Sequence, residues 1–333
     1  MDLAFFPAAA QTSPSALPAG IDYIWAWQGQ VAFFEANGKI GLIHKDGTIL
    51  AEAVYDKVYP YVNGFARVKR DGLWGMIDLK GRETVKPQWT LIGSPSEGMI
   101  AIMGSDHRWG YSDTTRRIVV QPVWDITYDF WEGVGMVTMN DLRGFINAKG
   151  ELVLDVAYRN ATGFYEGLFR VTENKQQVYR SIDGREVFRK DGYYGEDFSE
   201  GVAVFGGENG CGYIDKTGKF VIAPQYDLAE DFSQGLAAVM RQDGTWCYIN
   251  HNGDVVLEGP WRDPGNFSDG LAYVLLNGKY GYIDLSGELV LDYQWGEAGT
   301  FYNGFAEVRV ESNKGDMGYI NTDGEYICGI KAQ

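Results

Sequence analysis

The chain has 333 residues, of which 45% are hydrophobic, and a formal net charge of −16. This length and apolar content are sufficient for a substantial core, whereas the excess of carboxylates argues against direct nucleic-acid binding, which needs clustered Lys and Arg. The acidity can serve solubility or attract a basic partner, and both alternatives are kept. No apolar run of about 18 residues is present, so no membrane span is predicted.

Residues 1–20 are predicted to be a flexible leader, and residues 21–333 a single repeat array. The leader contains Leu3-Ala4-Phe5-Phe6 followed by Ala, Ser and Pro, and it lacks the basic start of a secretory signal. The three cysteines, Cys211, Cys247 and Cys328, are odd in number and fit no metal-binding spacing. We therefore expect reduced, packed thiols, a reducing compartment and a cytoplasmic location.

A repeat of about 34 residues extends over most of the chain. Its most regular part is an aromatic-Gly-apolar strand followed by an Asp-x-x-Gly turn, as in Tyr280-Gly281-Tyr282-Ile283-Asp284 with Gly287. Most copies also carry a Phe-x-x-Gly-apolar signature before this strand, as in Phe198-Ser199-Glu200-Gly201-Val202. Taking the central glycine or its equivalent as an anchor, nine copies follow one another: Gly41, Gly75, Gly110, Gly144, Val178, Gly212, Cys247, Gly281 and Gly318.

Each copy is predicted to be a three-stranded antiparallel meander. In the eighth copy, residues 271–276 form the first strand, and Asn277-Gly278 is a strong hairpin signal. Residues 280–284 and 288–292 form the second and third strands, which are rich in β-branched and aromatic residues. A connector with an aromatic residue and often a proline leads to the next copy. Because proline cannot donate to a strand ladder, it is predicted to end the third strand.

Several copies resemble the repeats of a bacterial family. Trp74-Gly75-Met76-Ile77-Asp78 and Trp109-Gly110-Tyr111, together with Pro224-Gln225-Tyr226-Asp227, are similar to WG repeats, also called KWG repeats. The resemblance covers about residues 23 to 330. It implies a tandem β-repeat fold and an interaction or envelope-associated role, and it supplies no catalytic residues.

The expected fold is all-β, an open superhelical, solenoid-like array of these units. The alternative is a closed or near-closed β-propeller. We favour the open array because propeller blades have four strands, and 34 residues is short for such a blade. The chain also begins near the first strand of copy one and ends after the third strand of copy nine, so no split unit offers ring closure.

Two recurring positions are candidate partner contacts. The connectors carry Trp89, Trp124, Trp261 and Trp295 in register; an outward-facing row could bind sugar rings or partner side chains, and the alternative is packing between units. The residue before the glycine of the Phe-x-x-Gly signature is often acidic. Among these acids, Glu132, Glu166 and Glu200 could attract cations or a basic partner, or they could accept backbone N–H bonds within turns.

Copies three and five depart from the consensus and are further candidate contact sites. In copy five, Gln177-Val178-Tyr179-Arg180 lacks the anchor glycine, and Gly192-Tyr193-Tyr194-Gly195 replaces the connector aromatic. We therefore include Tyr193 and Tyr194 among the candidate contacts.

The sequence contains no arrangement of residues typical of catalysis. His44, His107 and His251 lie in different copies at different phases, and no nucleophile elbow is present. Gly206-Gly207-Glu208-Asn209-Gly210 joins two strands and lacks the helix N-terminus of a phosphate-binding loop. We expect no enzymatic activity, no cofactor and no metal site.

The function expected is that of a non-enzymatic protein–protein interaction scaffold. One concrete form is an acidic immunity or inhibitor protein that faces a basic partner. The alternative is a carbohydrate or cell-envelope binding module that uses the recurring Trp and Tyr residues.

Overall fold

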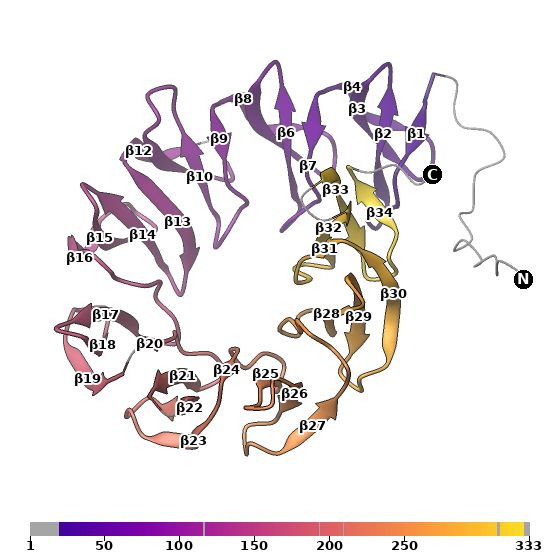
Figure 1. The fold of residues 1–333 in the computed structure, drawn as a ribbon. Coiled ribbons are helices and arrows are strands. Elements are labelled where there is room, and N and C mark those ends of the chain that lie inside the picture. The colour runs from indigo at the N-terminus through magenta and orange to yellow at the C-terminus, as the bar shows by residue number, and fades with distance from the viewer. Residues whose placement is uncertain (1–19, 116, 193, 209, 312–313, 330–333) are drawn as a thin grey trace, which may run out of the picture.

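The computed structural model describes residues 20–115, 117–192, 194–208, 210–311 and 314–329, so all of the predicted leader except Gly20 lies outside it. These residues form nine antiparallel sheets that follow one another along the chain and are arranged in a ring (Figure 1). The all-β tandem repeat is confirmed. The expectation of an open array is wrong, and the alternative, a β-propeller, is the observed architecture.

The sheets are numbered 1 to 9 in chain order, and the first three lie in the N-terminal third. Sheet 1 contains β1 (Tyr23–Ile24), β2 (Val31–Ala36), β3 (Lys39–His44) and β4 (Ile49–Tyr55). Sheet 2 contains β5 (Lys57–Val58), β6 (Phe65–Arg70), β7 (Leu73–Asp78) and β8 (Glu83–Trp89). Sheet 3 contains β9 (Leu91–Ile92), β10 (Met99–Met103), β11 (Trp109–Asp113) and β12 (Ile118–Trp124).

The middle three sheets follow the same order. Sheet 4 contains β13 (Ile126–Trp131), β14 (Val134–Met139), β15 (Leu142–Asn147) and β16 (Leu152–Tyr158). Sheet 5 contains β17 (Phe169–Glu173), β18 (Gln176–Arg180) and β19 (Glu186–Asp191). Sheet 6 contains β20 (Tyr194–Gly195), β21 (Val202–Gly207), β22 (Gly210–Asp215) and β23 (Phe220–Tyr226).

The last three sheets complete the ring. Sheet 7 contains β24 (Leu228–Ala229), β25 (Ala237–Met240), β26 (Trp246–Ile249) and β27 (Val255–Glu258). Sheet 8 contains β28 (Leu271–Leu276), β29 (Lys279–Asp284) and β30 (Leu289–Trp295). Sheet 9 contains β31 (Glu297–Ala298), β32 (Phe305–Glu311), β33 (Lys314–Asn321) and β34 (Tyr326–Cys328).

The three-stranded unit expected from the sequence is incomplete, because in most sheets the connector supplies a short fourth strand. In sheet 2, for example, Lys57 and Val58 pair with Lys69 and Val68. These short first strands lie on the inner side of the ring, and the last strand of each sheet lies on the outer side (Figure 1). The blade fits into 34 residues because its inner strand needs only two.

Proline does not end three of the outer strands as predicted, because Pro87, Pro122 and Pro224 lie within β8, β12 and β23, whereas Pro260 follows the end of β27. These strands are sheet edges, where a missing N–H removes no ladder bond. Each also contains an irregularity of register; Trp74 pairs with Trp89 and Met76 with Val85, so the outer strand bulges between these pairs.

This outer bulge explains the anchor glycines. A Cβ on Gly75 would lie 2.5 Å from the Val85 carbonyl oxygen, and one on Gly212 would lie 2.3 Å from that of Ile222. The two anchors that are not glycine confirm the relation. Val178 and Cys247 lie in sheets whose outer strands pair with them in regular register, Val178 opposite Arg189 and Cys247 opposite Glu258.

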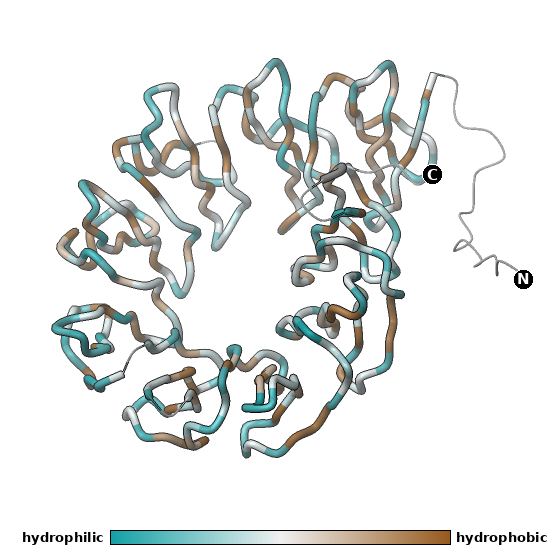
Figure 2. The backbone as a smooth tube through the Cα atoms, in the orientation of Figure 1, coloured by the Kyte–Doolittle hydropathy of each residue, from teal (hydrophilic) through white to brown (hydrophobic). Residues whose placement is uncertain are grey.

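Neighbouring sheets share hydrophobic cores. Between sheets 6 and 7, Val204, Tyr213, Phe232 and Val239 pack together with Cys211 and Cys247. Hydrophilic residues are concentrated at the turns (Figure 2). All three cysteines are unpaired and buried, as predicted.

A buried tyrosine after the anchor links successive sheets at several interfaces. Each donates its hydroxyl hydrogen to a backbone carbonyl 17 residues later, on the inner side of the next sheet: Tyr111 to Tyr128, Tyr179 to Glu196, Tyr213 to Glu230, Tyr248 to Gly265 and Tyr282 to Gly299. Burial raises the pKa of these phenols, so they stay protonated donors.

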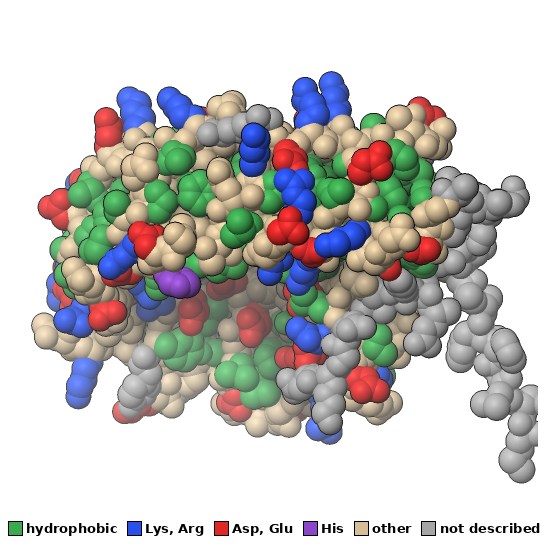
Figure 3. All heavy atoms as spheres, turned by 90° about the horizontal axis from the view of Figure 1, so that it is seen from above, with side chains coloured by type: hydrophobic (Ala, Val, Ile, Leu, Met, Phe, Trp, Pro, Cys, Tyr) green, Lys and Arg blue, Asp and Glu red, His purple; other side chains and the backbone are tan. Residues whose placement is uncertain are grey.

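The outer rim is mixed in character. Apolar side chains at the start of the outer strands are exposed, among them Leu152, Val221, Val256 and Val290. An edge view shows hydrophobic side chains among Lys, Arg, Asp and Glu (Figure 3). The prolines and bulges of these strands make the edges poor templates for further strand pairing.

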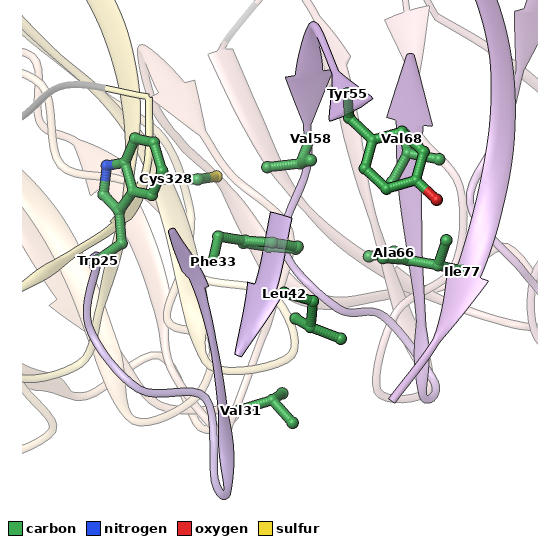
Figure 4. Packing of buried hydrophobic residues seen from close by; sticks show 10 residues of the cluster. All are labelled: Trp25, Val31, Phe33, Leu42, Tyr55, Val58, Ala66, Val68, Ile77 and Cys328. Atoms are coloured by element: carbon green, nitrogen blue, oxygen red, sulfur yellow. The ribbon is translucent and has the colours of Figure 1, made fainter. Parts of the chain in front are cut away.

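The ring closes by side-chain packing, without a sheet shared between the termini. Cys328 of β34 packs in one core with Trp25, Phe33 and Val58 from sheets 1 and 2 (Figure 4). The Ala26 N–H donates to the Tyr326 carbonyl at 3.0 Å. Sheet 9 therefore contacts both of the first two sheets, which is why the absence of a split unit did not exclude a ring.

Because the outer strand β23 bulges over Gly212, we expect Gly212→Ala to destabilise the protein by about 2 kcal/mol or more. The added Cβ would meet backbone that cannot move independently of β23. Gly207→Ala is the matched control, because a Cβ there meets nothing within 4 Å. Urea unfolding followed by circular dichroism measures both. Equal stability of the two variants would contradict this account of the anchor.

Candidate functional site

The turn between the inner strand and the next strand of each sheet is a tight two-residue hairpin. In sheet 2, Val62 pairs with Phe65, and both Asn63 (φ 50°) and Gly64 (φ 80°) are left-handed. This is the geometry of a type I′ turn, which explains the Phe-x-x-Gly-apolar signature. The same turn in sheet 1 carries Gly29 (φ 66°) where sheet 2 has Asn63.

The residue before the turn glycine joins each sheet to the next. From sheet 3 to sheet 9, its side-chain oxygen accepts the N–H of the corresponding turn glycine in the following sheet. The distances from glycine N to oxygen run 2.8 Å for Glu97, 2.9 Å for Glu132, 3.0 Å for Glu166, 3.0 Å for Glu200, 3.0 Å for Gln234 and 2.7 Å for Asp269. These side chains therefore accept backbone N–H bonds, which was the alternative to partner binding. The bonds reach the next sheet and do not stay within the turn.

The candidate contacts Glu132, Glu166 and Glu200 therefore have a structural role. Glu166 also forms an ion pair with Lys216 at 3.1 Å, and Glu200 lies 3.5 Å from the ring nitrogen of His251. Part of each of these two carboxylate side chains remains exposed, so their contact with a partner stays a prediction.

The four connector tryptophans do not form an exposed row. Trp261 and Trp295 are buried in the cores of sheets 7–8 and 8–9, and Trp89 and Trp124 are partly buried against the cores of sheets 2–3 and 3–4. These four side chains pack in the cores, which was the alternative to an outward-facing row. Tyr194 lies on the short strand β20 and is 36% exposed, whereas Tyr193 lies outside the described residues.

The inner segments of sheets 6 and 7 bring four carboxylates together: Glu196, Asp197, Glu230 and Asp231. Asp231 is partly buried, and burial, followed by the negative charges of Glu196, Asp197 and Glu230, raises its pKa to about 6. Burial likewise raises the pKa of Asp197 and Glu230. Arg170 is the cation that opposes this group, with its guanidinium 3.8 Å from Glu196.

The centre of the ring contains a cavity of about 480 Å³. Ser96 of sheet 3, Tyr128–Trp131 and Val134 of sheet 4, Gly163–Tyr165 before sheet 5 and Tyr302 of sheet 9 are among the residues that line it. Sheet 9 lies across the ring from sheets 4 and 5 in Figure 1, so the cavity is central. Sequence reasoning missed it, since none of the candidate contact residues named from the sequence lines the cavity.

Four aromatic rings are exposed in this cavity: Tyr128 (36%), Trp131 (51%), Tyr165 (38%) and Tyr302 (55%). The last three occupy a turn position where sheets 3, 6, 7 and 8 have serine, and Ser96, Ser199 and Ser233 donate there to a carbonyl of the next sheet. The signal available in the sequence was this replacement of serine by a large ring at a polar turn position.

The arrangement of aromatic faces next to carboxylates suits cations. Asp129 lines the cavity, and the charges of Asp197, Asp231 and Asp129 add to burial in raising the pKa of Tyr165. Within the described part of the chain, no group of His, Cys, Asp and Glu could hold a metal ion. None of the described residues forms a helix long and apolar enough to span a membrane.

A first prediction concerns the turn acids, which are the acidic residues directly before the turn glycine, such as Glu132, Glu166 and Glu200. Glu132→Ala should lower the free energy of unfolding by about 1 kcal/mol or more, because two N–H groups of sheet 5 lose their acceptor. Glu132→Gln should retain most of it, since Gln234 makes the equivalent bond with an amide oxygen. Urea unfolding of both variants measures the difference, and identical losses would show that charge and not acceptor geometry matters.

A second prediction concerns the raised pKa of Asp231. The carboxyl of Asp231 binds its proton more tightly in the folded chain than in the unfolded chain, because folding raises its pKa from 3.8 to about 6. As the pH rises through this range, Asp231 ionises and the free energy of unfolding falls. Asp231→Asn should therefore raise the free energy of unfolding by about 1–2 kcal/mol at pH 7.5 and by little at pH 4. Asp292→Asn, on an exposed outer-strand position, controls for net charge. A gain of equal size at both pH values would contradict the assignment.

Comparison with known proteins agrees with the repeat. The sequence pattern described as WG containing repeat matches residues 40–74, 74–103, 109–142, 144–176, 212–246, 246–280 and 280–313. No match was found among curated proteins.

Among solved structures, one described as a eukaryotic initiation factor aligns with a TM-score of 0.61 at 12% identity, over 92% of this chain and 96% of that chain. BamB from Moraxella catarrhalis aligns with a TM-score of 0.46 at 11% identity, over 81% of this chain and 92% of its own. At these identities the similarity concerns the fold alone. The family matches span most of the array, and the chain therefore belongs to the WG-containing repeat family.

Proposed function

We propose that the protein is a non-enzymatic interaction scaffold that binds a basic protein partner at the centre of the ring. The observation that carries this proposal is the group of four carboxylates on sheets 6 and 7, with Arg170 as its opposing cation. Burial, followed by repulsion from the neighbouring carboxylates, raises the pKa of Asp231, and a cationic partner would relieve this repulsion on binding.

The rest of the molecule supports a scaffold role. The ring is held by cores, tyrosine hydroxyls and turn acids between neighbouring sheets, so its inner surface is preorganised. An immunity or inhibitor protein that faces a basic partner is one concrete form of this function. The buried, unpaired thiols support its placement in a reducing compartment such as the cytoplasm.

The carbohydrate-binding alternative has weaker support. It depended on an exposed row formed by Trp89, Trp124, Trp261 and Trp295, and these rings are buried or partly buried in the cores between neighbouring sheets. The proposal of a protein partner is therefore preferred.

Affinity capture with the intact chain, at low and high salt, tests the function. We expect one stoichiometric basic protein whose capture weakens as salt rises. The double variant Asp197→Asn/Asp231→Asn should lose most of this capture. Asp155→Asn/Asp292→Asn removes the same charge from exposed outer-strand positions and should retain it.

Two results would count against the proposal. Equal loss of capture in both double variants would assign the effect to net charge and not to the ring centre. Salt-insensitive capture of a neutral or acidic protein would remove the role given to the carboxylates.

A further inference from the structure

We propose that the central cavity receives an arginine side chain of the basic partner, with its guanidinium stacked against Trp131 and Tyr302 and paired with Asp129. This inference rests on the proposed function and adds the residue type by which the partner is recognised. It also assigns a binding role to residues that the repeat pattern does not explain.

Exposed aromatic rings border the cavity. Trp131 and Tyr165 lie with ring centroids 6.3 Å apart and planes inclined by 48°, and Tyr302 borders the same cavity from sheet 9. Trp131 and Tyr302 are more than half exposed, unlike the tightly buried aromatics of the cores. Packing between sheets therefore does not account for them.

Trp131, Tyr165 and Tyr302 stand at a turn position that carries serine in several other sheets. Serine fits it with a hydroxyl that bonds to the next sheet, for example Ser199 to the Phe232 carbonyl at 2.7 Å and Ser233 to that of Phe267 at 2.6 Å. A large ring gives up this bond and exposes apolar surface. Three such rings around one cavity form a surface with aromatic faces available to a ligand.

The charge around the cavity selects a cation. Asp129 lines the cavity, and the carboxylates of Asp197 and Asp231 act on the Tyr165 hydroxyl together with it. Two cations of the chain lie nearby. The charge of Arg67 acts on Asp129, and its guanidinium lies over the ring of Tyr59, 4.1 Å from the centroid; Arg143 lies 6.0 Å from the centroid of Tyr128.

These two arginines also have their own backbone partners, because Arg67 donates to the Ile92 carbonyl and Arg143 to that of Ala161. The pair of Arg143 and Tyr128 shows that a guanidinium group fits over a tyrosine ring that lines this cavity. Arginine suits the site better than lysine, since its planar, weakly hydrated group stacks on rings and can pair with a carboxylate through two N–H bonds.

Titration of the full-length chain with N-acetylarginine methylamide, followed by saturation-transfer NMR, tests the inference. The citrulline analogue, which has nearly the same shape but no charge, is the matched ligand. We expect the arginine analogue to bind at least fivefold more tightly, because stacking of the cation on desolvated rings contributes about 1 kcal/mol or more.

Variants of the rings locate the binding. Trp131→Ser and Tyr302→Ser place at this turn the residue type found at Ser199 and Ser233, so the fold should persist, and each should weaken binding at least fivefold. Trp131→Phe and Tyr302→Phe keep a ring and should stay within about twofold to threefold of the natural chain. Phe220→Ser removes an exposed ring of the outer strand β23 and should change nothing.

Equal binding of the two analogues, or undiminished binding to both serine variants, would overturn the inference. So would binding of maltotriose in place of the arginine analogue with the same dependence on Trp131. If these results are found while Asp197→Asn/Asp231→Asn still abolishes capture of a basic protein, the proposed function stands and only the arginine site is wrong.

Discussion

The structure depends on the contact between one small sheet and the next. A sheet of three or four short strands cannot bury its own apolar faces, so each places residues such as Tyr213 and Val204 against Phe232 and Val239 of its neighbour. The tyrosine hydroxyl then reaches a carbonyl on the inner side of that neighbour, 2.8 Å away in the case of Tyr213 and Glu230. Stability is therefore shared along the ring instead of residing in one core.

The close approach of outer strands imposes the glycine pattern. Where the outer strand bulges over the strand beside it, only a residue without a Cβ fits, as at Gly75 on β7 and Gly212 on β22. Where the outer strand pairs regularly, Val178 and Cys247 are tolerated. Departure from the consensus in these two copies thus reflects local strand register. It does not by itself mark a contact surface.

The turn acids show how one residue can satisfy two requirements. A left-handed Glu is an unfavourable backbone choice, and Glu132, Glu166 and Glu200 nevertheless hold φ near 50°. Their carboxylates accept N–H groups of the next sheet, which offsets this strain and aligns successive turns. The same alignment gathers the inner segments around a shared space, where acidic and aromatic side chains that are remote in sequence meet.

The sequence by itself determined the repeat, three of the strands in each unit and the family, because periodic glycines and alternating apolar residues are local signals. It also indicated that the thiols are unpaired, and it left open whether the turn acids accept backbone N–H bonds or contact a partner. Ring closure was decided only in three dimensions, since it depends on Cys328 packing against Trp25 and Val58, residues about 300 positions apart in the chain. The central cavity is likewise tertiary: Trp131, Tyr165 and Tyr302 occupy equivalent positions in their own repeats, and only the curvature of the ring brings them to one space.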